Sequence, residues 1–322
     1  EDWQYKGVVY NEMKGAMGNA DAQLYRSLGA ALAPDTPYRH NSGGEPKVIP
    51  DLTHENLVAF HRRHYTGANA CFVTHGDLDT AELHARFAPY LEDSGEAVPL
   101  PEPQPRLGAP VHERVPVPLQ EGQDERDASI SLLSWMLPGD TRHLPDVLLG
   151  ELLHQLLLGH AGAPLRHSVE SSGLGRALGF SGFSNDGFDP TFSVSLKGMD
   201  PADYDRFEPL VLDTLRTVRD KGFGEQEIAA ALHQLELSRR TISGDRFPFG
   251  LELAIGRVTE AWQQGTDPYA WLDDEAAMET LRTRVAAPGF WADLLDRWFL
   301  DNPHRVLLQT EADAAFNKQR DE

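Results

Sequence analysis

The segment AVPLPEPQPRLGAPVHERVPVP, residues 97–118, constrains the fold of this 322-residue chain more than any other stretch. Its seven prolines have no backbone N–H to donate to a helix or to a sheet ladder. We therefore predict an extended, fairly stiff linker over 97–118. The linker divides the chain into residues 1–96 and 119–322, and the total length leaves room for two domains.

The part after the linker, 119–322, has the pattern of one complete domain. We predict a strand over 128–137, a helix over 144–158, two strands around an Asn-Asp-Gly turn within 175–198, several helices to about 299, and a strand over 304–310. Strands followed by runs of helices indicate the α+β class. We expect an antiparallel or mixed sheet with helices packed on one face.

The part before the linker resembles the back half of a similar domain. We predict helices over about 5–32, 53–65 and 79–92, and a strand over about 69–75. No opening sheet strands precede these elements, so 1–96 is interpreted as the C-terminal part of a first domain. The single cysteine, Cys71, excludes an intrachain disulfide and is expected to be a small buried side chain in the strand.

Charge and hydropathy exclude several classes of partner. The formal net charge is −21, which repels phosphate backbones and argues against nucleic-acid binding. The same charge would attract basic peptides, although acidic surfaces also serve solubility alone. No apolar run reaches the roughly 18 residues that a membrane span needs. The chain opens on Glu-Asp-Trp, without a signal-peptide pattern, and we expect a piece of a longer polypeptide.

Glu12 is an anomaly within its predicted helix, GVVYNEMKGAMG. At about 100° per residue it lies about 40° from Val8, inside the apolar arc of the helix. A buried carboxylate needs a cation, a metal or several hydrogen-bond donors. Lys6 and Lys14 lie on other faces of the helix and offer no local partner. The alternative is a solvated face with no function.

Metal-ligand spacing occurs elsewhere, but in incomplete form. Candidate pairs are His61 with His64, and Glu151 with His154, each at i,i+3; His160 and His167 fit helix ends or loops. A surface pair and a core or helix-end role are the respective alternatives. His-Glu-x-x-His, His-x-x-Glu-His, a phosphate-binding Gly-Lys-Ser/Thr loop and a Gly-x-Ser-x-Gly elbow are all absent from the sequence. Motif counting therefore yields no complete catalytic site.

Several motifs occur in the order and spacing of a known family. They are YKGVVYNEMKGAMG at 5–18, SGGEPK at 42–47, HYTGANACFVTHGDLD at 64–79, HQLLLGHAGAPLRHSVESSGLG at 154–175 and NPHRVLLQT at 302–310. The chain resembles, over essentially its whole length, the presequence-protease branch of the pitrilysin/insulinase (inverzincin) zinc metallopeptidases.

This resemblance implies a zinc site to which Glu12 contributes. In the family, two histidines and a general-base Glu come from an inverted motif, His-x-x-Glu-His, on an earlier helix. A third ligand, the Glu of the Asn-Glu-Met-Lys-Gly run, comes from a later helix and matches Glu12. Three protein ligands leave one position for a water molecule that can attack a peptide carbonyl.

The departures from the family pattern limit what this chain can do alone. The inverted motif is absent, so we expect no catalytic residue here, no bound zinc, and no activity of the chain by itself. The family register places a decayed motif in the second part, with Gly150, Leu153 and His154 at the three motif positions. The resemblance therefore implies that 119–322 is a second, non-catalytic peptidase-like domain. The implied partners are peptide substrates, the missing N-terminal segment and the second half of the same polypeptide, which together form a closed chamber.

Two other interpretations stay open. The chain could be a non-catalytic scaffold or peptide-binding subunit with the same fold, and an intact upstream motif would decide against this. A metal-binding domain built on the two i,i+3 pairs is a third interpretation. For location, the composition favours a bacterial cytosol, with mitochondrial matrix or plastid as the alternative.

Overall fold

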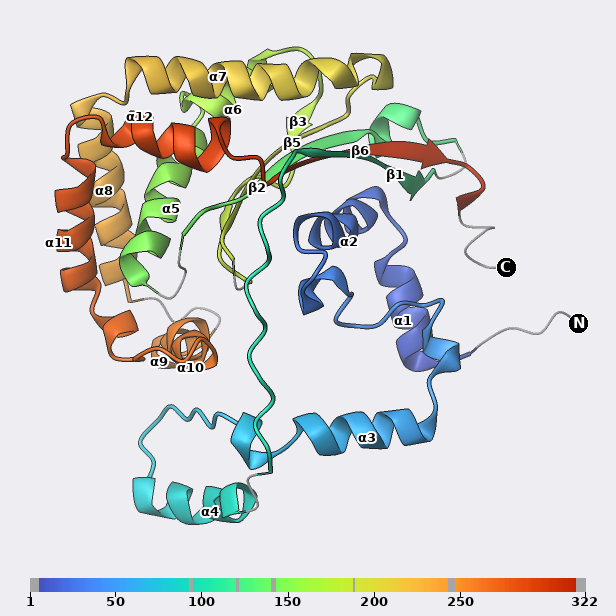
Figure 1. Ribbon diagram of the computed structural model, residues 1–322, viewed down its shortest axis with the longest axis vertical. Coiled ribbons are helices and arrows are strands. Elements are labelled where there is room, and N and C mark those ends of the chain that lie inside the picture. Colours follow the sequence, from blue (N-terminus) through green and yellow to red (C-terminus); the bar gives the residue numbers. More distant parts are fainter. Residues whose placement is uncertain are drawn as a thin grey trace, which may run out of the picture.

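The computed structural model describes residues 6–92, 95–119, 122–139, 143–187, 189–242 and 247–316. Its centre is a mixed sheet with the strand order β1-β6-β2-β5-β3, in which β4 also pairs with β5 (Figure 1). The strands are β1 Val111–Pro118, β2 Ile130–Met136, β3 Ala177–Leu178, β4 Gly182–Ser184, β5 Thr191–Lys197 and β6 Arg305–Asp313. Among the described strands, β1 and β6 run parallel to one another, and the other pairs are antiparallel.

Strand β1 differs from the prediction of a linker through residue 118. Its eight residues pair with β6 along their full length, although Pro116 and Pro118 are among them. Proline is tolerated there because β1 is an edge strand, with β6 as its only neighbour in the described sheet. Residues 97–110 remain without helix or strand, as predicted. The division of the chain into domains stays a prediction.

A layer of helices covers one face of the sheet. It contains α5 Leu144–Leu158, α6 Pro164–Ser171, α7 Phe207–Lys221, α8 Glu225–Arg240, α11 Asp274–Val285 and α12 Phe290–Leu295 (Figure 1). The sheet side chains Leu133, Trp135, Phe192 and Val194 are fully buried beneath it. Alternate side chains of a strand point to the same face of the sheet, so the helices of this layer pack against every second residue of each strand. The predicted α+β class with a mixed sheet is confirmed.

The opposite face of the sheet carries α2, Ala20–Leu32, which belongs to the segment before the Pro-rich stretch. Leu24, Leu28 and Leu32 recur every four residues, so they form one buried stripe on this helix. The stripe packs against the other side of the strands, including Leu132 and Val306. The two parts of the chain therefore share a core, and helices cover both faces rather than one.

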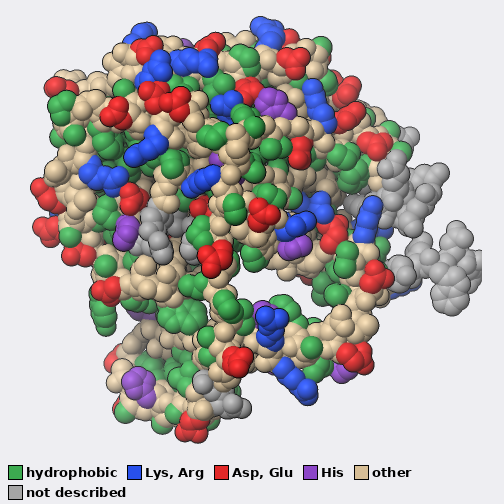
Figure 2. Space-filling view, in the orientation of Figure 1, with side chains coloured by type: hydrophobic (Ala, Val, Ile, Leu, Met, Phe, Trp, Pro, Cys, Tyr) green, Lys and Arg blue, Asp and Glu red, His purple; other side chains and the backbone are tan. Residues whose placement is uncertain are grey.

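The remaining helices before residue 93 stand apart from the sheet. They are α1 Val8–Ala16, α3 His54–His64 and α4 Thr80–Glu92, and none of them has a buried residue. Figures 1 and 2 show α3 and α4 as an arm that stands off from the body. Within the described residues, no helix combines the length and apolar character needed to cross a membrane.

The strand predicted over about 69–75 does not form. These residues have no ladder partner among the described strands, and a strand needs a neighbour to satisfy its backbone groups. Cys71 is consequently exposed, so the expectation of a buried cysteine in a strand is wrong. The predicted helix over 5–32 is instead two helices, α1 and α2. The side chain of Asn19 accepts a hydrogen bond from Ala22 N and starts the second one.

Between α8 and α11 the chain forms a short, irregular helical stretch. It consists of α9 Phe249–Leu253, a π-helical turn Ala254–Val258 and α10 Thr259–Gln263. We call Phe249–Gln263 the π-containing segment. Such wide turns place one extra residue in a helix and often line functional surfaces.

Candidate functional site

Glu12 lies in α1 on a face that points away from the body. Val8 and Val9, which share its arc, are 85% and 55% exposed, and Glu12 is exposed as well. The side of the helix that holds Met13 and Met17 faces inward, because Met13 lies against Gly43 and Met17 is buried. The helix predicted around Glu12 forms, but the part of its apolar arc that holds Val8, Val9 and Glu12 faces solvent and is not buried. No described residue forms an ion pair or hydrogen bond with the Glu12 carboxylate.

Zinc does not fit the described residues by themselves. Among them, no group of three or more His, Cys, Asp or Glu side chains is arranged to hold a metal ion. Glu12 offers one carboxylate, whereas a catalytic zinc site needs three protein ligands. Any zinc site that uses Glu12 must therefore draw its other ligands from outside the described residues.

The His61 and His64 rings are both used in aromatic contacts on α3. The His61 ring stacks on Tyr65 at 4.6 Å between centroids, and the His64 ring stacks on Phe60 at 4.2 Å. Each contact joins residues four apart on an exposed helix. These contacts fit the surface-pair alternative, and neither histidine belongs to a group of three or more potential metal ligands among the described residues.

Glu151 and His154 point to different partners. Glu151 accepts a hydrogen bond from Arg239 at 2.5 Å. His154 lies against Gly182 of β4, where an added Cβ would come within 2.2 Å of the ring Nδ1. Burial lowers the pKa of His154, so the ring is favoured in its neutral form. Glu151 and His154 line a common small cavity, but they belong to no group of three or more potential metal ligands among the described residues.

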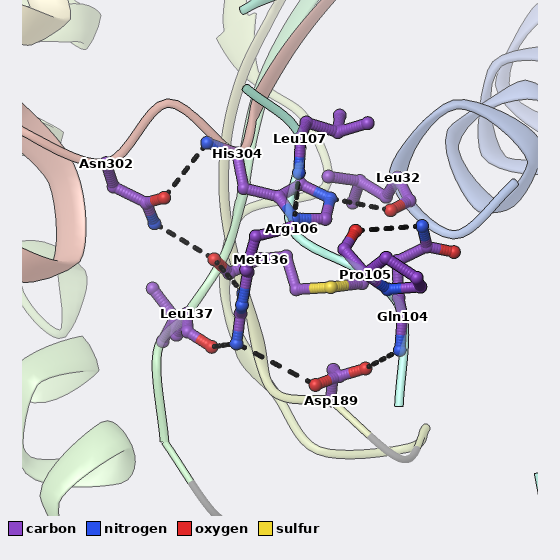
Figure 3. A network of polar contacts seen from close by, with 10 residues as sticks. All are labelled: Leu32, Gln104, Pro105, Arg106, Leu107, Met136, Leu137, Asp189, Asn302 and His304. Atoms are coloured by element: carbon purple, nitrogen blue, oxygen red, sulfur yellow. Dashed lines mark hydrogen bonds and ion pairs between the residues drawn. The ribbon is translucent and has the colours of Figure 1, made fainter. Parts of the chain in front are cut away.

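A buried polar junction, drawn in Figure 3, is centred on His304 at the start of β6. His304 is completely buried. Its Nε2 lies 2.7 Å from Leu32 O, and its Nδ1 accepts a hydrogen bond from Leu107 N at 3.4 Å. Since a carbonyl only accepts, Nε2 carries the proton, and burial lowers the pKa of the ring. A neutral histidine thus joins the end of α2 to the Pro-rich segment and to β6.

Arg106 extends this junction toward the loop before β5. It donates hydrogen bonds to Met136 O at 2.9 Å and to Leu137 O at 2.7 Å. Its guanidinium also lies 3.8 Å from the carboxylate of Asp189, which accepts a hydrogen bond from Gln104 N. These hydrogen bonds hold the Pro-rich segment against the sheet (Figure 3). This junction was not predicted from the sequence. Its only local sign in the sequence is that polar residues, Gln104 and Arg106, stand between prolines.

Two cavities lie on either side of the loop that follows β4. The first, about 720 Å³, lies between α2 and the β4–β5 side of the sheet, and we call it the apolar cavity. Met17, Leu28 and Met136 are buried in its wall. Tyr25 and Phe180 meet edge to face at 5.6 Å at its boundary, and each remains about half exposed.

The second cavity, about 710 Å³, lies between α5 and the π-containing segment, and we call it the acidic cavity. Its two arginines are already paired: Arg239 with Glu151 at 2.5 Å, and Arg257 with Asp274 at 2.7 Å. Three further carboxylates line it, from Asp186, Glu252 and Glu260. No described lysine or arginine forms an ion pair with these three. The cavity therefore keeps an excess of negative charge.

Glu260 is the most perturbed acid of this cavity. Its Oε1 accepts a hydrogen bond from Asn185 Nδ2 at 3.2 Å. Burial, and secondarily the negative charge of Asp186, raise the pKa of Glu260 to about 7. Tyr38, Asp186 and Gly187 line both cavities, so these residues form a shared wall between them.

Comparisons with known proteins agree with this architecture. Residues 51–235 match the family model of the peptidase M16 inactive domain. The chain is 33% identical to presequence protease 1, chloroplastic/mitochondrial, of Arabidopsis thaliana over 97% of its length, which is 30% of the relative. It is 28% identical to Protein HypA of Clostridium perfringens over 99% of its length, 33% of that relative. The chain thus spans about a third of these curated relatives.

Solved structures share the fold at low sequence identity. A protease from Helicobacter pylori matches 94% of this chain, and 70% of its own, with a TM-score of 0.73 at 15% identity. A peptidase M16 inactive domain from Pseudomonas fluorescens matches 95%, and 69% of its own, with a TM-score of 0.68 at 20% identity. The family resemblance read from the sequence is confirmed. The chain belongs to the peptidase M16 family, and residues 51–235 match the model of its inactive domain.

Proposed function

We propose that this chain is part of a presequence-protease-like zinc metalloendopeptidase that degrades short, unstructured peptides in a closed chamber. In this proposal Glu12 supplies one zinc ligand, and the sheet with its helices is a non-catalytic domain that helps to enclose the peptide. Family membership and the names of the relatives support the peptidase class. When bound, zinc would supply an activated water for peptide hydrolysis.

The observation that carries the proposal is the exposed arc of α1. Val8, Val9 and Glu12 lie on one solvent-facing side of a nine-residue helix. Burying a valine side chain is worth roughly 1.5–3 kcal/mol, so such an arc gains stability when another segment covers it. A covering segment that brings two histidines would complete a three-ligand site with Glu12.

The test begins with the gene that encodes this chain. We expect the coding sequence upstream of the Glu1 codon to contain His-x-x-Glu-His. The encoded polypeptide should then bind about one zinc per chain, consistent with a catalytic site. It should also cleave a fluorescence-quenched peptide, with loss of turnover on chelation. The 322-residue chain by itself should bind no stoichiometric zinc.

A matched pair of variants tests the role of Glu12. Glu12→Gln in the longer polypeptide should lower zinc content and turnover together. Glu279→Gln, at an exposed position within α11, should leave both unchanged. Equal zinc content in the two variants would overturn the assignment of Glu12. Absence of the upstream motif, together with absence of turnover, would overturn the peptidase function.

A non-catalytic scaffold or peptide-binding subunit is the second candidate. The match to an inactive domain favours it, as do the two cavities. Loss of the upstream motif with retained peptide binding would support this candidate. For location, we propose a bacterial cytosol on composition; the relatives include mitochondrial and chloroplastic proteases and a bacterial protein.

A further inference from the structure

The acidic and apolar cavities adjoin one another and differ in chemistry. We propose that together they form a bipartite peptide subsite, in which the acidic cavity takes a basic side chain and the apolar cavity takes an aliphatic or aromatic one. The inference rests on the proposed function only in assuming a peptide ligand. Binding at this subsite needs neither zinc nor Glu12.

The shared wall makes simultaneous occupation possible. Tyr38 and Gly187 approach so closely that an added Cβ at Gly187 would lie 3.6 Å from the Tyr38 ring. Asp186 lies beside them and lines both cavities. In an extended peptide, side chains two residues apart point the same way and are separated by about 6–7 Å. A peptide lying across this thin wall can therefore place one side chain in each cavity.

Charge complementarity determines which side chain enters the acidic cavity. Arg239 and Arg257 are engaged by Glu151 and Asp274, and they leave Asp186, Glu252 and Glu260 without a cation among the described residues. Guanidinium groups bind carboxylates through paired, charge-assisted hydrogen bonds. The wall also contains apolar side chains, from Leu144, Val147 and Trp271, against which the aliphatic stem of a basic residue can lie.

Glu260 is a carboxylate that a bound cation would stabilise in its ionised form. Its pKa of about 7 leaves it partly protonated at neutral pH, although Asn185 donates a hydrogen bond to it. A bound guanidinium would replace that proton, because an opposite charge favours the carboxylate. Asp186 and Glu252 add negative charge around it, and Arg257 is held by Asp274. Binding of a basic peptide should therefore strengthen between pH 6 and pH 8.

The apolar cavity provides the second half of the subsite. Its wall is built from Met17, Leu28 and Met136, and methionine adapts to side chains of different shape. Its boundary residues Tyr25 and Phe180 are exposed enough to contact a ligand. Arg26, at the same boundary, is already paired with Glu45 at 2.5 Å, and Asp186 contributes a negative charge at the shared wall. An apolar side chain is the chemistry that such a cavity favours.

Fluorescence polarisation with the 322-residue chain tests the proposal. The probe is a fluorescein-labelled, end-blocked peptide, Gly-Gly-Phe-Gly-Arg-Gly-Gly. Replacing its Arg by Gln, or its Phe by Ser, should each weaken binding about tenfold, and moving the two residues apart should do the same. The chelator EDTA should have no effect. Equal affinity for the Arg and Gln peptides would overturn the proposal.

Variants of the chain locate the two halves of the subsite. Glu252→Gln combined with Glu260→Gln should weaken the Arg peptide about tenfold and leave the Gln peptide unchanged. Phe180→Ser should reduce discrimination between the Phe and Ser peptides. Glu279→Gln is the control, and circular dichroism verifies that each variant is folded. If the variants lost the same affinity for every peptide, the subsite would be overturned. Failure of zinc binding or of turnover in the longer polypeptide would overturn only the peptidase function.

Discussion

Replacing His304 by leucine should destabilise the chain by disconnecting α2 from the sheet. His304 is fully buried, and leucine fills similar space without either ring nitrogen. The substitution leaves Leu32 O without its 2.7 Å donor, and Leu107 N without its 3.4 Å acceptor. An unsatisfied buried polar group costs about 1–3 kcal/mol. The hydrogen bond from Leu107 N is long, so its loss should cost an amount near the lower end of this range. We therefore expect the free energy of unfolding to fall by about 2–3 kcal/mol in total.

Urea unfolding, followed by circular dichroism and tryptophan fluorescence, measures this loss. His233→Leu is the control, since His233 is exposed on α8. His304→Gln should recover part of the stability, because its side-chain amide can still donate to Leu32 O. A loss below about 0.5 kcal/mol for His304→Leu, or an equal loss for the control, would refute the assignment of His304 as the link between these elements.

The same variant should change the pH dependence of stability in a defined direction. Burial lowers the pKa of His304 below its usual 6.5, so the folded state binds the proton less readily than the unfolded state. The contribution of the neutral ring is therefore complete above pH 6.5 and declines as the pH falls below it. The stability gap between wild type and His304→Leu should narrow between pH 7.5 and pH 5.5. A gap that widens in this interval would contradict the neutral-ring assignment.

Three further substitutions have definite expected outcomes. Glu260→Gln should raise the free energy of unfolding at pH 8 by roughly 1–2 kcal/mol after solvent screening, and leave it unchanged at pH 4. The reason is that the cost of ionising Glu260 in the folded state develops between pH 4.5 and about 7. Thermal melts at both pH values measure this difference. Gly182→Ala should lower the stability of the folded chain, because Gly182 has φ +124° and lies against the His154 ring. Adding His154→Ala should remove the steric clash but not the backbone strain, and a double-mutant cycle would separate the two effects. Leu28→Ala should cost about 2–5 kcal/mol, whereas Leu57→Ala, at a position 67% exposed, should cost under about 1 kcal/mol in urea unfolding.

The local sequence pattern was sufficient to predict a helix or strand when the pattern also indicated how the element is buried. Helix α5 was predicted because its leucines are nearly continuous, and such a helix must be buried on most sides. Strand β1 was missed because its prolines remove the usual strand signal. Its edge position, which tolerates them, depends on β6, nearly 200 residues later in the chain. Residues 69–75 show the converse, since they have a strand pattern but no described neighbour to pair with.

The candidate site was predictable only in part, for a related reason. Glu12 was placed correctly on a helix, but the direction of its face depends on α2 and the loop around Gly43. The His304 junction joins residues 32, 107 and 304, so no local spacing can reveal it. The shared wall of the two cavities likewise brings Tyr38 beside Gly187. Long-range packing decides both features.

Helices α1 and α2 follow one another and both carry apolar residues, yet their environments differ. The apolar stripe of α2 has a sheet to pack on, whereas Val8 and Val9 of α1 have no cover among the described residues. A segment that covers these valines also removes water from Glu12, which shares their arc. A desolvated carboxylate is costly unless positive charge accompanies it. A segment that binds this face of α1 must therefore bring a cation, a metal or several hydrogen-bond donors, and in the peptidase that we propose, a metal ion held by two histidines would meet that requirement.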